Sequence, residues 1–173
     1  MDGLTFIWIH ASIPSMARIA RVVVPGAPHH VTQRGNRRQQ TFFSDSDYAS
    51  YLALAREWCS KVGLEIWAYC LMPNHVHLVV VPPTSEALAD GIGQIHRRFS
   101  RMINFREGWR GFLWQGRFAS FPMDERHLVA ATRYILLNPV RAKLVAKAEL
   151  WPHSSAQANI SGRDDGLVRT APL

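Results

Sequence analysis

Two runs of strand-forming residues with a very short connection constrain the fold of this chain more than any other feature. The runs extend from Leu64 to Leu71 and from His75 to Val81, and only Met-Pro-Asn at 72–74 separates them. A connection this short, built from turn-forming residues, lets the two strands pair only as an antiparallel hairpin. Any fold of this chain must therefore contain an antiparallel sheet around this hairpin.

The rest of the chain alternates between extended and helical hydrophobic periods. A first strand is predicted over 28–34, followed by a basic turn at 35–38. A helix capped by Ser44 or Ser46 ends at Gly63. After the hairpin come a long helix from 85, a loop over 109–116, a strand over 117–123 and a helix over 124–137. This order, βαββαβα, predicts an α/β (α+β) sandwich of the ferredoxin-like split βαβ type, with an antiparallel sheet, helices on one face and an extra C-terminal helix.

Length and charge describe one basic domain. The 173 residues are 47% hydrophobic, and no linker, repeat or low-complexity stretch divides them. Twenty Lys and Arg against thirteen Asp and Glu give a net charge of +7 and a pI of about 10.1. This favours a polyanionic partner over an acidic small molecule. Many soluble proteins are mildly basic, however, so the positions of the cations matter more than their sum.

The two cysteines and the N-terminal residues give no sign of secretion or membrane insertion. Cys59 and Cys70 are too few and too widely spaced for a zinc ribbon or a disulfide framework, and both lie in apolar patterns. We expect reduced core residues in a cytoplasmic protein. The apolar run from Leu4 to Ile9 lacks a basic leader and is too short for a membrane span.

Two histidines at the start of the second hairpin strand are candidate metal ligands. Side chains alternate along a strand, so His75 and His77 share one face while Val76 and Leu78 point to the other. Two neutral imidazoles and an amide oxygen from Asn138 would fill part of the coordination sphere of a divalent ion and leave positions for water and a phosphate oxygen. The alternative is a pair of satisfied or exposed imidazoles without a metal.

A tyrosine and an asparagine four residues apart mark the end of the last predicted helix. Tyr134 and Asn138 should share one helix face just before Pro139 ends the helix. A tyrosine there could instead pack its ring on the sheet. The helix nevertheless has an apolar stripe without Tyr134, made by Leu128, Ala131 and Ile135.

Arginines interleaved with aromatic residues form the third candidate element. Guanidinium groups that follow a backbone and rings that stack on bases suit single-stranded nucleic acid. A solvated helix face with buried tryptophans would give the same pattern. The candidate DNA-binding residues are Arg34, Arg37, Arg38, Arg97, Arg101, Trp114 and Arg117.

Taken together, five segments resemble the REP-associated tyrosine transposases, within the single-tyrosine transposase family of the HUH endonuclease superfamily. They are the segments at 30–37, 69–77, 114–117, 133–142 and 151–155. The resemblance runs from Met16 to Ser155. It implies an N-terminal extension over 1–15 with Met16 as the natural start, a transposase domain over 16–155 and a flexible C-terminal tail over 156–173.

The resemblance also implies a chemistry. His75, His77 and Asn138 would bind Mg²⁺ or Mn²⁺, and Tyr134 on the extra helix would be the nucleophile. A phenol with a pKa of ~10 is mostly protonated at neutral pH, so its attack needs a metal-polarised phosphate. The substrate would be single-stranded DNA, often hairpins formed by palindromic repeats. The products would be a 5′-phosphotyrosine and a free 3′-OH that permits rejoining. Relatives include monomers and homodimers.

Two other functions fit the same residues. The chain could be a domesticated DNA-binding regulator with an idle site, or a metal-dependent phosphodiesterase that uses water in place of Tyr134. Labelled hairpin oligonucleotides with manganese, analysed on a denaturing gel for covalent adducts, would distinguish them.

Overall fold

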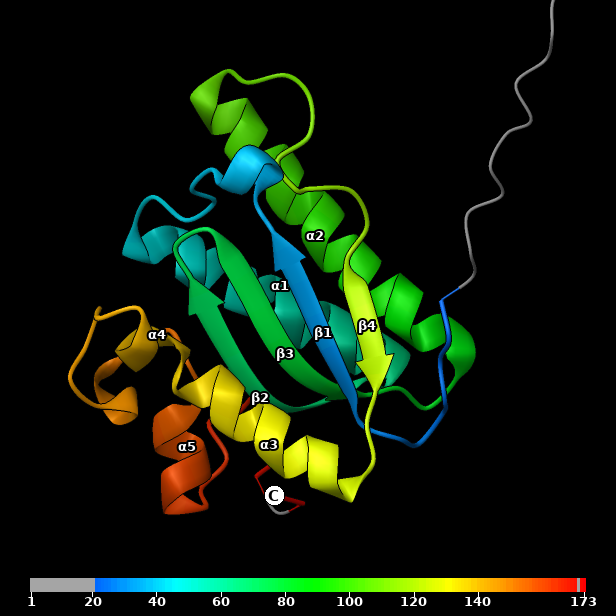
Figure 1. Cartoon of the computed structure of the whole chain (residues 1–173). Coiled ribbons are helices and arrows are strands. Elements are labelled where there is room, and N and C mark those ends of the chain that lie inside the picture. The colour runs from blue at the N-terminus through cyan, green and yellow to red at the C-terminus, as the bar shows by residue number, and fades with distance from the viewer. Residues whose placement is uncertain (1–20, 171) are drawn as a thin grey trace, which may run out of the picture.

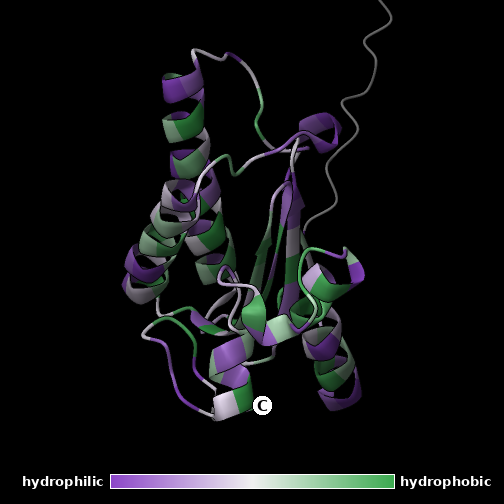
Figure 2. Cartoon of the chain, turned by 90° about the vertical axis from the view of Figure 1, so that its left-hand side faces the viewer, coloured by the Kyte–Doolittle hydropathy of each residue, from purple (hydrophilic) through white to green (hydrophobic). Residues whose placement is uncertain are grey.

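A four-stranded antiparallel sheet lies between two layers of helices in the computed structural model (Figures 1 and 2), which describes residues 21–170 and 172–173. The strands are β1 (His29–Arg34), β2 (Glu65–Met72), β3 (His75–Val81) and β4 (Ala119–Pro122), in the order β2-β3-β1-β4. The helices are η1 (Asn36–Arg38), α1 (Asp45–Val62), α2 (Ser85–Glu107), α3 (Glu125–Leu136), α4 (Asn138–Arg141), η2 (Ala148–Leu150) and α5 (Ala156–Ser161). The predicted ferredoxin-like order is confirmed.

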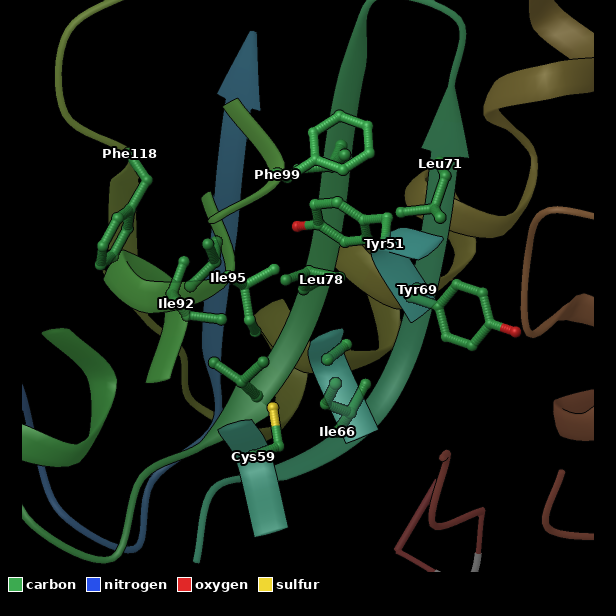
Figure 3. Packing of buried hydrophobic residues seen from close by; sticks show 14 of the residues in the cluster. Tyr51, Cys59, Ile66, Tyr69, Leu71, Leu78, Ile92, Ile95, Phe99 and Phe118 are labelled. Carbon is green, nitrogen blue, oxygen red and sulfur yellow. The ribbon is translucent and has the colours of Figure 1, made fainter. Parts of the chain in front are cut away.

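Helices α1 and α2 cover one face of the sheet and enclose the main core. Helix α1 begins after Ser44, whose N–H donates to the Asp47 carboxylate, and ends at Gly63 in the left-handed conformation. Asp47 also pairs with Arg106 and so joins α1 to α2. Tyr51, Leu78 and Phe99 meet between the helices and β3 (Figure 3).

Helix α3 packs on the opposite face of the sheet. Its buried residues Leu128 and Ile135 form a smaller cluster with Cys70 of β2 and Val79 of β3. Asp124 caps the helix, since its side chain accepts the N–H of His127. The extra helix of the prediction is thus held across the sheet surface, on the side away from α1 and α2 (Figure 1).

The β2–β3 turn is tied to the end of β1. The carbonyl of Pro73 accepts hydrogen bonds from the backbone N–H groups of Thr41 and Phe42, at 2.9 and 3.1 Å, and the carbonyl of Asn74 accepts one from Gly35 at 2.8 Å. A Cβ at Gly35 would lie 2.2 Å from the carbonyl oxygen of Gln39, so only glycine fits. The sheet end that carries the histidines is therefore held by backbone hydrogen bonds from residues 35–42, which are distant in the sequence.

Three predictions need correction. The last strand is shorter than 117–123 and covers only 119–122. Pro139 does not end a helix: α3 ends at Leu136, and Pro139 lies in the first turn of α4, where its missing N–H costs nothing. The segment predicted as a tail from residue 156 contains secondary structure, since it forms α5 and its buried Val168 makes a bridge with Ile66 of β2.

Several other expectations concern the cysteines and the termini. Cys59 and Cys70 are both free and buried, as predicted. The expected extension over 1–15 and the start at Met16 lie outside the described residues. Across the part of the chain that the structure describes, no helix has both the length and the apolar character needed to cross a membrane.

Candidate functional site

His75 and His77 lie side by side at the start of β3 on the α3 face of the sheet. Their ring centroids are 5.0 Å apart and their planes are perpendicular. His77 pairs with Thr32 of β1 and Cys70 of β2, while the intervening Val76 is fully buried in the main core. The predicted alternation is confirmed, since the side chains of successive β3 residues point to opposite faces of the sheet.

The Nδ1 atom of each ring already has a hydrogen-bond partner. The side-chain N–H of Asn74 donates to the carbonyl of Arg38 at 3.1 Å, so its Oδ1 is the atom that accepts the Nδ1–H of His75 at 2.6 Å. Nδ1 of His77 lies 3.0 Å from Nε2 of His30. With the proton on Nδ1, each ring keeps the lone pair of Nε2 for another ligand.

Both rings are neutral at physiological pH. Burial and the nearby charge of Arg34 lower the pKa of His75 to about 4. Burial is also the main cause that lowers the pKa of His77 to about 3, with smaller contributions from His75, His30 and Arg34. Metal ions bind neutral imidazole, so no proton has to leave these rings first.

The donor set fits an open site for a hard or borderline divalent ion. Within residues 21–170 and 172–173, no three His, Cys, Asp or Glu side chains gather closely enough to hold a metal ion. Two oriented imidazoles plus an amide oxygen would leave coordination positions for a substrate phosphate, as catalytic sites require.

Tyr134 of α3 lies beside His77 on the same side of the sheet. Its ring centroid is 5.8 Å from that of His77, with perpendicular planes, and 42% of the residue is exposed to solvent. Ile135, the next residue, is fully buried against the sheet. Tyr134 therefore lies at the side of the interface between α3 and the sheet, where solvent reaches it. The guanidinium carbon of Arg141 lies 4.3 Å from the centre of the tyrosine ring. The phenol is thus held near the imidazoles and remains accessible.

Asn138 occupies the first position of α4, one turn beyond Tyr134. Leu137 lies between α3 and α4 as the cap of both, and the carbonyl of Asn138 accepts the N–H of Ala142 at 2.9 Å. The side chain is half-buried. Asn138 as third ligand stays a prediction.

The predicted DNA-binding residues fall into two groups in space. Arg34 ends β1 opposite His75, and Arg37 and Arg38 follow in η1. Both η1 arginines have positive φ angles, 53° and 62°, which non-glycine residues seldom adopt and which concentrate at functional sites. This group borders the candidate metal site.

The second group surrounds the loop between α2 and β4. Arg97 and Arg101 are exposed on α2, and Arg117 precedes β4. Trp114 is only 6% exposed, with its indole N–H donating to the carbonyl of His96 at 3.3 Å. Its burial leaves the ring only a small exposed surface, and base contact by Trp114 stays a prediction.

Sequence analysis missed two residues of the site. His30 orients His77 from the neighbouring strand, and Arg141 covers Tyr134 from α4. His30 pairs directly with Val79 in the sheet, which brings it next to His77 on the same face. The alternation of side chains in β1 indicates which face His30 occupies. Only the register of β1 against β3 shows that it lies beside His77.

Comparison with known proteins identifies the family. Residues 24–138 match the model of the family described as "Transposase IS200 like". The chain therefore belongs to the IS200-like transposase family.

Two individual proteins are similar over most of the chain. A Haemophilus influenzae protein named as a REP-associated tyrosine transposase is 26% identical over 127 residues, which cover 66% of this chain and 72% of the relative. The solved structure of a REP-associated tyrosine transposase bound to a REP hairpin has a TM-score of 0.67 and 22% identity, covering 88% of each chain. The resemblance to REP-associated tyrosine transposases is confirmed.

Proposed function

We propose that this transposase cleaves and rejoins single-stranded DNA through a covalent bond between Tyr134 and a 5′ phosphate, with a divalent metal ion at His75 and His77. The placement of an accessible phenol beside one of two oriented, neutral imidazoles supports this most strongly. A nucleophile and a phosphate-binding metal would then meet at one place on the sheet surface.

The cleavage step exchanges one phosphate ester for another. The Tyr134 oxygen attacks phosphorus and loses its proton, and the bond from phosphorus to the 3′ oxygen breaks. The departing 3′ oxygen takes up a proton and becomes a 3′-OH. Because the new tyrosyl ester retains the bond energy, a 3′-OH from another strand can displace Tyr134 by the reverse step without ATP.

The site's own residues would each have one task in this step. His75, His77 and Asn138 would hold Mg²⁺ or Mn²⁺, which would polarise the phosphate and reduce its negative charge when bound. Asn74 and His30 would orient the imidazoles through their contacts with Nδ1, and a proton on each Nδ1 would leave Nε2 for the metal. Arg141 keeps the Tyr134 ring in place through its face contact.

The substrate is proposed to be a single-stranded hairpin. The solved relative is described as bound to a REP hairpin. In this chain, the net charge of +7 and the arginines of η1 beside the histidines would favour a phosphate backbone at the site.

Replacing Tyr134 by phenylalanine tests the proposal directly. The full chain is incubated with end-labelled single-stranded hairpins and manganese, and covalent adducts are separated on a denaturing gel. The parent should cut and form an adduct whose tyrosine mass spectrometry assigns to Tyr134. Tyr134→Phe should keep DNA binding and lose both cleavage and adduct, because only the hydroxyl is removed.

Tyr69→Phe is the matched control. Tyr69 lies on the main-core face, where its hydroxyl donates to Asp165 at 3.0 Å, so its variant should still form the adduct. A regulator with an idle site would bind DNA without cutting it. A water-using phosphodiesterase would cut in the Tyr134→Phe variant and form no adduct. An adduct mapped to Tyr69 would refute the assignment of Tyr134.

A further inference from the structure

A cavity of 470 Å³ opens between α2, the loop at 111–118 and β1, on the main-core side of the sheet. This volume lies within the usual range for small-ligand sites, roughly 300 to 1,000 Å³. Gln33 reaches it from β1, and its side-chain N–H donates to the carbonyl of Gly116 at 3.0 Å, closing one wall. The cavity is separate from the candidate metal site, which occupies the other face of the sheet.

His96 of α2 lines this cavity with a ring that is almost fully buried. The residue is 6% exposed, and its Nε2 lies 3.0 Å from the hydroxyl of the fully buried Tyr51. Its Nδ1 is buried and has no hydrogen-bond partner. When the phenol donates to Nε2, the neutral ring carries its proton on Nδ1. Because this atom is closed off from solvent, it lies behind the cavity surface, where a ligand does not reach it.

The mouth of the cavity combines aromatic surface with positive charge. Phe112 is 83% exposed there, while Trp114 and Phe118 form deeper walls. Arg21, Arg97 and Arg117 line the cavity, and among the described residues no Asp or Glu does. A flat ring with an attached anion fits this combination.

A second hollow continues from the cavity toward the candidate metal site. It is lined by Asn36 of η1 and shares Phe112, Trp114 and Arg117 with the cavity. Asn36 donates its N–H to the carbonyl of Leu113 at 2.8 Å, so η1 and the loop lie side by side (Figure 1). The second hollow thus reaches η1, whose Arg38 carbonyl accepts a hydrogen bond from the Asn74 side chain beside His75.

We propose that this cavity receives one unpaired base of the single-stranded DNA substrate, with the adjoining phosphates along Arg97 and Arg117. The identity of the ligand as single-stranded DNA rests on the proposed function. A polymer is favoured over a free nucleotide because the cationic and aromatic lining continues beyond the cavity in the second hollow.

Gly93 provides a test that does not depend on removing a buried residue. It lies within α2 and lines the cavity, and a Cβ built on it meets no atom within 4 Å. Gly93→Leu would fill the cavity while improving helix propensity, so the variant should fold at least as well as the parent. Gly93→Ala is the matched control, because it gives the same helix benefit and leaves most of the cavity open.

Affinities are measured by fluorescence anisotropy for single-stranded oligonucleotides in which one base at a time is replaced by an abasic residue. For the parent and Gly93→Ala, loss of one particular base should weaken binding about tenfold, in the range of a single stacked base. Gly93→Leu should bind the intact oligonucleotide about tenfold more weakly, and the abasic penalty at that position should disappear. Thermal unfolding should show that all three proteins are folded.

The outcomes separate this proposal from the proposed function. A flat abasic profile, or a profile unchanged in Gly93→Leu, overturns the base pocket even if the Tyr134 adduct forms normally. A parent that shows the penalty but forms no adduct retains the pocket and loses the tyrosine mechanism. Absence of any binding to single-stranded DNA overturns both, and equal competition by free nucleotides at the same concentration overturns the polymer assignment.

Discussion

The two faces of the sheet use neighbouring residues of the same strand for opposite purposes. Toward α1 and α2, Val76, Leu78 and Val80 of β3 are at most 1% exposed and belong to the main hydrophobic cluster. Toward α3, the alternate positions His75 and His77 lie on the same side of the sheet as a half-exposed tyrosine. The main-core face supplies stability, which allows the other face to keep polar groups partly uncovered.

The comparison predicts that substitutions on the two faces separate activity from stability. Side chains on opposite faces of one strand have few partners in common, so their effects should be nearly independent. The main-core face contains an exception, however, because the orphaned His96 and the adjoining cavity interrupt its apolar packing.

His75→Ala should lower DNA cleavage by about 10³-fold or more and leave the fold intact. Loss of one ligand removes metal polarisation of the phosphate, which contributes several kcal/mol to the transition state. Single-turnover cleavage with manganese, circular dichroism and urea unfolding on the same preparation would measure this. Unfolding of the variant would instead indicate that His75 is a structural residue, and the contrast between the faces would fail.

Leu78→Ala should produce the opposite result and destabilise the protein by about 2 to 5 kcal/mol, the usual cost of truncating a buried leucine. Leu78 is 1% exposed in the main core. Below its unfolding midpoint in urea the variant should still cleave DNA, since no side chain of the candidate site is changed. A specific loss of cleavage in fully folded Leu78→Ala protein would show that the two faces are coupled.

Local signals explain which parts of the fold could be predicted. The hairpin strand His75–Val81 and helix Asp45–Val62 appear where the sequence places them, because turn residues, the Ser44 cap and Gly63 act within a few residues. The restart of a helix at Asn138 was missed, since a proline reads as a stop although the first helical turn tolerates it. The C-terminal segment was missed because its order depends on contacts with distant β2.

The candidate site divides in the same way. The pairing of His75 with His77 follows from strand alternation alone. The contact of His30 with His77 requires the register of β1 against β3, and the burial of Trp114 requires the packing of a loop under α2. No spacing within one segment contains that information. The tertiary partners that orient a site are therefore harder to find than the groups that perform its chemistry.

Acid should destabilise the protein through His96, the polar exception on the main-core face. Burial lowers the pKa of His96 to about 3, well below its ordinary value of 6.5. Between these values the unfolded chain binds a proton that the folded chain does not, so the free energy of unfolding falls as the pH drops below 6.5. From pH 7 to 5 this contributes about 1 to 2 kcal/mol.

Urea unfolding of the parent and of His96→Gln at both pH values isolates this contribution. The variant should lose less stability on acidification than the parent, whatever its stability at pH 7. Equal losses would mean that His96 is already protonated in the fold, or that its face is more hydrated than the structure indicates.

Arg97 and Arg101 provide the smallest and most specific test, because they would extend the DNA path onto the helix layer away from the histidines. Both are exposed on α2. Each phosphate contact on single-stranded DNA changes the slope of log K against log salt by ~0.7, so replacing both arginines by glutamine should flatten it by at most ~1.4. Binding titrations at several salt concentrations would measure the slope.

A control pair of arginines distinguishes a specific phosphate contact from an effect of net charge on that slope. Arg56 and Arg163 are equally exposed but lie outside the predicted DNA-binding groups, so their double replacement by glutamine removes the same charge. If both pairs flatten the slope equally, the effect is one of net charge and α2 carries no specific contact. If only the Arg97 and Arg101 pair does, phosphates reach α2, and the DNA must pass around the end of the sheet to connect the helix layer with Tyr134.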